Sequence, residues 1–186
     1  MALENEYDYM TYEEYLTYIS GLDNSVEYSN GEIFCMSPTH PIHNKVQNEL
    51  YFQIRGILKD CSKCDVYTSD VAVNFKADEV QHQFEPDLMV VCDNKFDGAI
   101  YKGIPDLIIE VLSRATKDRD TGIKLDVYEK FGVKEYWIVD INLKEIIVYS
   151  NNKNGKYRSI MRYSEDMKMI WNEGTIRLKE IFKFFN

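Results

Sequence analysis

Two apolar runs that both begin with Pro-Asp constrain the fold of this chain more than any other feature. The first is "FEPDLMVVC" (84–92) and the second is "IPDLIIEVLS" (104–113). Both have apolar residues on each of their alternating faces, which is typical of central strands covered on two sides. The second run nevertheless contains a glutamate, Glu110. Because an unpartnered carboxylate is costly there, Glu110 is expected to lie at a water-exposed sheet edge or strand end, to bind a metal ion, or to be neutral through a raised pKa.

The segments around these runs predict an α/β or α+β fold in which helices flank a mixed central sheet. An amphipathic helix is predicted over 116–131, followed by the strand pair "EYWIVD" (135–140) and "EIIVYS" (145–150). Strands that precede and follow a helical crossover are typical of a mixed sheet. The remaining predicted elements are helices over 11–20, 41–58 and 177–185, a hairpin around Asn30-Gly31, and strands over 64–75 and 155–164.

Length and composition indicate a single domain over residues 1–186, in which residues 1–25 form an acidic helical segment. The sequence has no repeat or linker-like stretch, and its hydrophobic content of 45% excludes a mainly disordered protein. No apolar stretch approaches the roughly 20 residues of a membrane helix. The acidic N-terminus is unlike a signal peptide. We therefore expect a cytoplasmic protein that does not enter a membrane.

The four cysteines are expected to remain thiols in that compartment. They are Cys35, Cys61, Cys64 and Cys92. The pair in "CSKC" (61–64) has the spacing of half a zinc site, but a structural zinc site usually needs a second such pair. The chain has none, so two ordinary thiols are the favoured interpretation.

The net charge of −9 is concentrated near the start of the chain. Residues 1–44 hold eight acidic side chains and no Lys or Arg, which leaves 22 basic and 23 acidic side chains in the rest. A protein that coats nucleic acid is usually basic, because its affinity comes from neutralising phosphates. The charge pattern counts against such a protein but not against an enzyme that contacts nucleic acid at one site.

From residue 26 onward, three motifs occur in the order "VEYSNGEIFCMSPTHPIH" (26–43), "FEPDLMVV" (84–91) and "PDLIIEVLSRATKDRDTGIKLDVYEKFGVKEYWIVD" (105–140). On these motifs the chain resembles the Uma-two family of endonucleases, within the PD-(D/E)xK superfamily. The long third motif is the most specific. The resemblance implies a restriction endonuclease-like fold, hydrolysis of DNA phosphodiester bonds and a homodimer.

The resemblance also implies a metal site at Asp87 and Glu110. Mg²⁺ or Mn²⁺ would bind there, since hard divalent cations take oxygen ligands and keep several waters, so that one or two carboxylates suffice. Such an ion can polarise a phosphoryl oxygen and help to generate hydroxide, as phosphodiester hydrolysis requires.

The remaining catalytic residues depart from the superfamily pattern. The superfamily has a lysine two residues after the glutamate, and this chain has Leu112 there. The family pattern offers instead a helical lysine that matches Lys124, which would stabilise negative charge near the phosphate. Glu27 and His43 match further family positions and are predicted to complete the catalytic set.

Three functions remain open on the sequence alone. The first is the metal-dependent endonuclease. The second is a non-catalytic binding or regulatory module that keeps the nuclease fold, because the lysine is missing at position 112. The third is a hydrolase of another phosphoester, because a fold does not fix a substrate. The sequence discloses no target preference.

Overall fold

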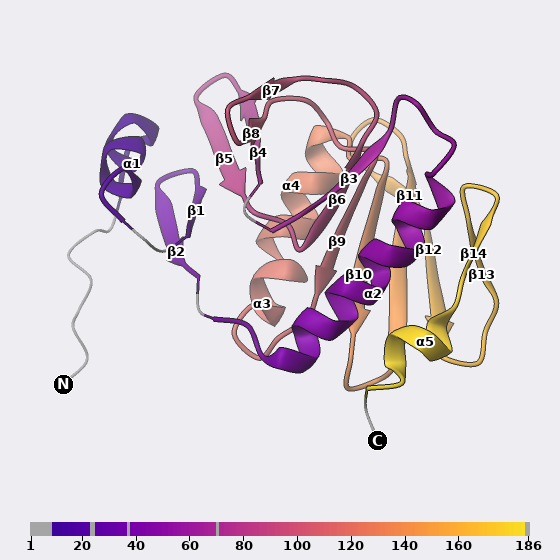
Figure 1. The fold of residues 1–186 in the computed structure, drawn as a ribbon. Helices are drawn as coiled ribbons and strands as arrows, with labels where there is room; N and C mark the ends of the chain where they lie inside the picture. Colours follow the sequence, from indigo (N-terminus) through magenta and orange to yellow (C-terminus); the bar gives the residue numbers. More distant parts are fainter. Residues whose placement is uncertain (1–8, 23–24, 37, 70, 185–186) are drawn as a thin grey trace.

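The computed structural model describes residues 9–22, 25–36, 38–69 and 71–184. Its strands form two mixed six-stranded sheets and one small hairpin, and its helices pack around them (Figure 1). This arrangement confirms the predicted class, with two mixed sheets where one central sheet was expected.

The central sheet contains both Pro-Asp runs as neighbouring strands. Its order is β12-β11-β10-β9-β6-β3. Strands β9 and β10 are parallel, and every other neighbouring pair in this sheet is antiparallel. The strands span Asp65–Thr68 (β3), Leu88–Val91 (β6), Leu107–Val111 (β9), Glu135–Asp140 (β10), Glu145–Asn152 (β11) and Tyr157–Ser164 (β12).

The second sheet begins with the predicted hairpin and has the order β2-β1-β5-β4-β8-β7. Asn30 and Gly31 both have positive φ, 47° and 104°, as the two-residue turn requires. The strands span Val26–Ser29 (β1), Glu32–Cys35 (β2), Ala72–Ala77 (β4), Val80–Phe84 (β5), Phe96–Asp97 (β7) and Ile100–Tyr101 (β8). The single strand predicted over 64–75 was therefore wrong, because the chain leaves the central sheet after β3 and enters the second sheet at β4.

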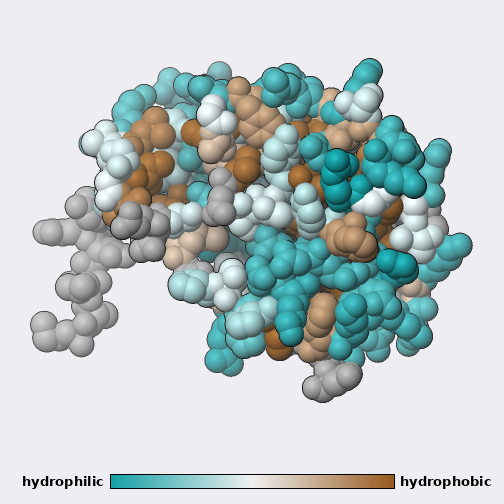
Figure 2. Space-filling model, viewed as in Figure 1, coloured by the Kyte–Doolittle hydropathy of each residue, from teal (hydrophilic) through white to brown (hydrophobic). Residues whose placement is uncertain are grey.

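Helices α2 (Pro41–Ile57) and α5 (Leu178–Phe182) cover one face of the central sheet and lie in front of it in Figure 1. This side is largely hydrophilic on its outer surface over α2 (Figure 2). The hairpin of β13 (Met169–Trp171) and β14 (Gly174–Ile176) joins the same core. None of the helices in the described part of the chain has the length and apolar character needed to cross a membrane.

The other face of the central sheet packs against α4 and the second sheet. The continuous helix predicted over 116–131 is instead two helices, α3 (Lys117–Asp120) and α4 (Ile123–Phe131). The chain breaks at Gly122, where a Cβ atom would lie 2.7 Å from the carbonyl oxygen of Asp118. Helix α1 (Tyr12–Ile19) packs on β1, where the hydroxyl of Tyr15 donates to the carbonyl of Val26 over 2.7 Å.

Two of the cysteines differ from the sequence expectation. Cys64 and Cys92 form a disulfide, whereas Cys35 and Cys61 are free. The expectation of four thiols was therefore wrong for Cys64 and Cys92. The pairing follows from the antiparallel register of β3 and β6, which places Asp65 opposite Val91 and the two cysteines one step further along.

Candidate active site

Asp87 and Glu110 lie together because β6 and β9 run antiparallel. Leu88 pairs with Ile109, so one further step of the register places Asp87 opposite Glu110. The N–H of Asp87 donates to Glu110 Oε2 over 3.4 Å, and the N–H of Val111 donates to Asp87 Oδ2 over 2.7 Å. The two carboxylates therefore meet on one face of the central sheet and line one pocket.

Glu110 is buried near the end of a central strand and has two side-chain partners. Its Oε1 atom lies 2.9 Å from Lys124 Nζ and accepts a hydrogen bond of 3.1 Å from the hydroxyl of Tyr128. Burial raises the pKa of Glu110 well above its ordinary value, although the charge of Lys124 acts in the opposite direction. Of the alternatives open on the sequence, the edge of the sheet is thus wrong, because β9 has a neighbour on each side.

Lys124 enters the site from α4 and is only 2% exposed. Its Nζ atom lies 2.8 Å from Glu27 Oε1, 2.9 Å from Glu110 Oε1 and 3.6 Å from Asp120 Oδ1. Burial opposes the charged form, but these three carboxylates outweigh it and raise the pKa of Lys124. The lysine therefore stays charged at neutral pH. Leu112, at the lysine position of the superfamily, is a buried core residue.

Glu27 reaches the site from the second sheet. Its side chain is fully buried in β1, and Oε1 accepts a hydrogen bond of 3.0 Å from the N–H of Glu85. Its Oε2 lies 3.4 Å from Nη1 of Arg119, whose guanidinium stacks 5.0 Å from the centre of the Phe34 ring. The structure therefore brings the predicted Glu27 to Lys124, whereas the hairpin residue Glu32 is exposed.

His43 lies in the first turn of α2, and its side chain contacts Asp87. Its Nε2 atom is 3.1 Å from Asp87 Oδ2, and its side chain is 5% exposed. Burial opposes protonation of the ring, but the hydrogen bond and charge of Asp87 raise the pKa of His43. One turn further on, Gln47 donates to the carbonyl oxygen of Asp87 over 2.7 Å, which fixes the backbone at the metal-ligand position predicted from the sequence.

Three members of the cluster were not predicted as site residues: Asp120, Arg119 and Tyr128. The spacing of Asp120, Lys124 and Tyr128 contains the missing signal, because residues four apart on helical segments share a face. In the sequence, the spacing of Ile123, Val127 and Phe131 by four residues predicts that Ile123 lies on the buried face of this helix. The structure buries Lys124 and Tyr128 and leaves Ile123 37% exposed.

The pocket above these residues has a volume of about 610 Å³. Asp87, Glu110, Lys124 and His43 line this pocket. Arg114 and Arg119 also line it and supply positive charge that suits an anionic substrate. The arrangement combines buried carboxylates with cations that can contact a phosphate.

The donor set fits a hard divalent cation held by two carboxylates and waters. Four carboxyl groups, those of Asp87, Glu110, Glu27 and Asp120, lie around only two permanently charged cations, Lys124 and Arg119. Both oxygens of Asp120 and the Oε2 of Glu27 have no hydrogen-bond partner among the described residues. Among the same residues, no group of three or more His, Cys, Asp or Glu side chains is arranged so that it could bind a metal ion on its own.

Comparison with known proteins places this chain in a family. A crystal structure from Anabaena variabilis, titled as "a putative nuclease belonging to DUF820", superposes with a TM-score of 0.76 at 18% identity, covering 94% of this chain and 98% of that one. An uncharacterized protein of Synechocystis sp. is 27% identical over 147 residues, which are 78% of this chain and 76% of that protein. The sequence model of the Uma2 family, described as "Putative restriction endonuclease", matches residues 12–170. Because this match spans most of the sequence, the chain belongs to the Uma2 family.

Proposed function

We propose that this protein is a Mg²⁺- or Mn²⁺-dependent endonuclease that hydrolyses DNA phosphodiester bonds. The observation that carries the proposal is the meeting of Asp87 and Glu110 in one pocket, with Lys124 in contact with Glu110. Membership of the Uma2 family supports nuclease chemistry and DNA as the substrate. Dimerisation and a cytoplasmic location remain predictions from the sequence.

Asp87 and Glu110 are the proposed metal ligands. Oδ2 of Asp87 is engaged by Val111 and His43, and Oε1 of Glu110 by Lys124 and Tyr128. Oε2 of Glu110 also accepts a hydrogen bond of 3.4 Å from the N–H of Asp87, so the two residues that would hold the ion are fixed relative to each other. When bound, the ion polarises a phosphoryl oxygen and lowers the pKa of a coordinated water.

Lys124 acts in this proposal as a fixed positive charge. Three carboxylates hold its ammonium group in place and keep it protonated, so it does not serve as a general base. A charge that is already oriented stabilises the negative charge that develops on the phosphate without further reorganisation. Lys124 also fixes Glu110 through their contact of 2.9 Å.

His43 is the proposed proton acceptor. Asp87 holds Nε2 of the ring, while Nδ1 has no hydrogen-bond partner among the described residues. In this proposal a neutral His43 accepts a proton at Nδ1, which requires the attacking water to reach this buried atom, and Asp87 stabilises the imidazolium that results. This role requires a pH above the raised pKa of His43.

Cleavage of supercoiled plasmid in Mg²⁺ or Mn²⁺ tests the proposal. Asp87→Asn and Glu110→Gln should each reduce nicking at least about 100-fold, the scale expected when a group that stabilises transition-state charge is lost. Asp106→Asn is a matched control, because Asp106 also follows a proline before a central strand but pairs with Lys134 outside the pocket. Equal nicking by all four proteins would show a contaminant and overturn the assignment.

A non-catalytic binding module is the second candidate, and the burial of Leu112 at the superfamily lysine position favours it. Calorimetry with Mn²⁺ separates the two candidates. Millimolar Mn²⁺ should bind the wild type and not Glu110→Gln if the site is an endonuclease centre. No binding by the wild type would favour the binding module.

A further inference from the structure

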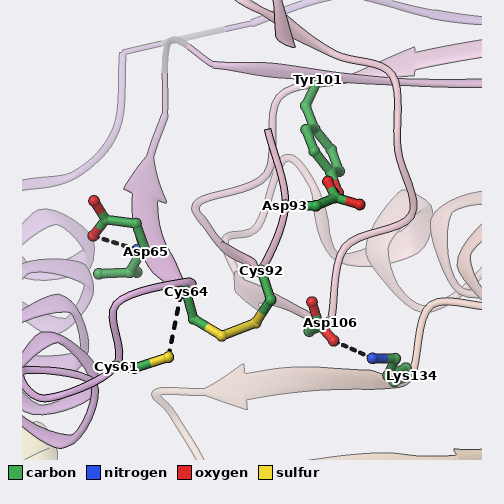
Figure 3. The surroundings of a disulfide bond; sticks show 9 residues. Cys61, Cys64, Asp65, Cys92, Asp93, Tyr101, Asp106 and Lys134 are labelled. Atoms are coloured by element: carbon green, nitrogen blue, oxygen red, sulfur yellow. Dashed lines mark hydrogen bonds and ion pairs between the residues drawn. A yellow bond between two sulfur atoms is a disulfide. The ribbon is translucent and has the colours of Figure 1, made fainter. Parts of the chain in front are cut away.

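Three of the four cysteines lie together where β3 begins and β6 ends, away from the candidate active site. Cys92 follows β6, whereas Asp87 precedes it, so the two sites lie at opposite ends of this strand. Cys64 precedes β3 and is bonded to Cys92 (Figure 3). The free thiol of Cys61 lies three residues before Cys64.

Cys61 is held against the disulfide by its own turn. Its N–H donates to the carbonyl of Leu58 over 2.9 Å, and its Sγ atom accepts a hydrogen bond of 3.2 Å from the N–H of Cys64. Figure 3 shows the Cys61 side chain beside Cys64, on the side away from Cys92. The local fold thus places a thiol in contact with the backbone of Cys64, which belongs to an existing disulfide.

The cluster is open to solvent through a pocket of about 550 Å³. All three cysteines line this pocket, together with the three basic residues Arg55, Lys59 and Lys63 and the two acidic residues Asp65 and Asp93. Thiolates are the attacking species in disulfide exchange. The three basic residues suit a small thiol that carries carboxylates.

We propose that Cys61, Cys64 and Cys92 form a thiol–disulfide exchange site. In the internal step, the Cys61 thiolate attacks Sγ of Cys64, the Cys61–Cys64 bond forms, and the Cys64–Cys92 bond breaks. Cys92 leaves as a thiolate and takes up the proton that Cys61 released. One disulfide is lost and one is gained, so the step requires no oxidant or reductant.

The external partner of the site is a small anionic thiol. Its thiolate attacks Sγ of Cys64, which gives a mixed disulfide and frees Cys92. Cys61 then attacks the same Cys64 sulfur, forms the Cys61–Cys64 disulfide and releases the small thiol unchanged. Cys61 is therefore the resolving thiol in this route.

Peptide mapping of the full chain tests the proposal, with glutathione as the probe. The sequence suits trypsin, because lysines separate the cysteines into peptides 60–63, 64–76 and 77–95. After anaerobic incubation with glutathione, acid quenching and alkylation, the wild type should yield the linked pair 60–63/64–76 beside 64–76/77–95. Cys61→Ser should lose the first pair and accumulate the glutathione adduct on 64–76.

Two further variants keep the test decisive. Cys92→Ser should form the Cys61–Cys64 disulfide on air oxidation, and Cys35→Ser, which removes a free cysteine outside the cluster, should behave as the wild type. The proposal is overturned if Cys61 is fully alkylated in every wild-type sample. It is equally overturned if Cys61 and Cys64 both stay thiols in Cys92→Ser, or if the oxidised wild type contains no disulfide.

Discussion

Lys124 and Glu27 join the two sheets of the molecule through a buried ion pair of 2.8 Å. Lys124 belongs to α4, which packs on the central sheet, and Glu27 belongs to β1 of the second sheet. Both side chains are almost completely buried, so little solvent screens the pair. The pair therefore links the position of the second sheet to the orientation of the lysine beside Glu110.

Replacing Lys124 by Met should destabilise the fold, because three buried carboxylates would lose their common cation. Breaking a buried ion pair costs about 3 to 5 kcal/mol. We expect a loss of this size in the free energy of unfolding, measured with urea at pH 7. The loss should shrink toward pH 4, where the carboxylates take up protons.

Lys117→Met is the matched control for that variant. Lys117 is an exposed lysine on α3, and substitutions of this kind usually change stability by less than about 0.5 kcal/mol. Similar losses in Lys117→Met and Lys124→Met would contradict the role assigned to the buried cluster.

Binding of Mn²⁺ should stabilise the folded protein. At a concentration 100 times its dissociation constant, a ligand adds about 2.7 kcal/mol, which corresponds to a rise in Tm of about 5 to 10 °C for a chain of this size. Differential scanning fluorimetry should show the rise in the wild type and in Asp106→Asn, and its absence in Asp87→Asn. A full shift in Asp87→Asn would place the bound ion elsewhere.

Tyr128→Phe should cost about 1.5 to 3 kcal/mol, because the hydroxyl of Tyr128 donates to the buried carboxylate of Glu110. Tyr157→Phe removes a hydroxyl that has no hydrogen-bond partner among the described residues, and it should cost little. Chemical denaturation of both variants measures the difference. Equal losses would show that packing, and not the bond to Glu110, sets the cost.

The alternating apolar runs predicted the central strands for physical reasons that are local. The pairing of Asp87 with Glu110 was implied by the family resemblance, and the antiparallel register of β6 and β9 brings the two residues together in the structure. The hairpin at Asn30-Gly31 was predictable because only a few residue types adopt its backbone angles.

Other parts of the site depend on contacts that a single sequence does not contain. Arg119 of α3 meets Glu27 of β1 in the second sheet, a tertiary contact that no local pattern encodes. The disulfide depends on the register of β3 against β6. The single strand predicted over 64–75 did not separate β3 from β4, so this register could not be predicted. Tertiary contacts also buried Lys124 in place of Ile123.

His82 should make stability depend on pH in mildly acidic solution. Burial and then the charge of Lys130 lower the pKa of His82 from 6.5 to about 4, and its Nδ1 atom lies 2.9 Å from Oγ of Ser29. Between these values the unfolded chain binds a proton that the native state does not. The free energy of unfolding should therefore fall as the pH is lowered through this range.

The expected loss is on the order of 1 to 2 kcal/mol, after allowance for solvent screening. Urea unfolding of the wild type and of His82→Gln at several pH values measures it. The variant should show a flatter profile between pH 6.5 and 4, the range set by the shift of His82. Parallel profiles would assign the pH dependence to other groups.

Asp120→Asn should separate stability from activity. Asp120 is 1% exposed, neither of its oxygens has a hydrogen-bond partner among the described residues, and burial raises its pKa. An acid whose pKa is raised on folding weakens the fold as the pH rises above its unfolded value. Asp120→Asn should therefore be more stable than the wild type at pH 8, with a gap that closes near pH 4.

The same substitution removes one of the three carboxylates that hold Lys124. Because such supporting contacts are worth about 10- to 100-fold in activity, plasmid nicking should fall by at least about tenfold while the protein becomes more stable. Asp118→Asn, at an exposed position on α3, should change neither property. A variant that loses stability at pH 8 but keeps full nicking activity would show that Asp120 supports the fold and not the orientation of Lys124.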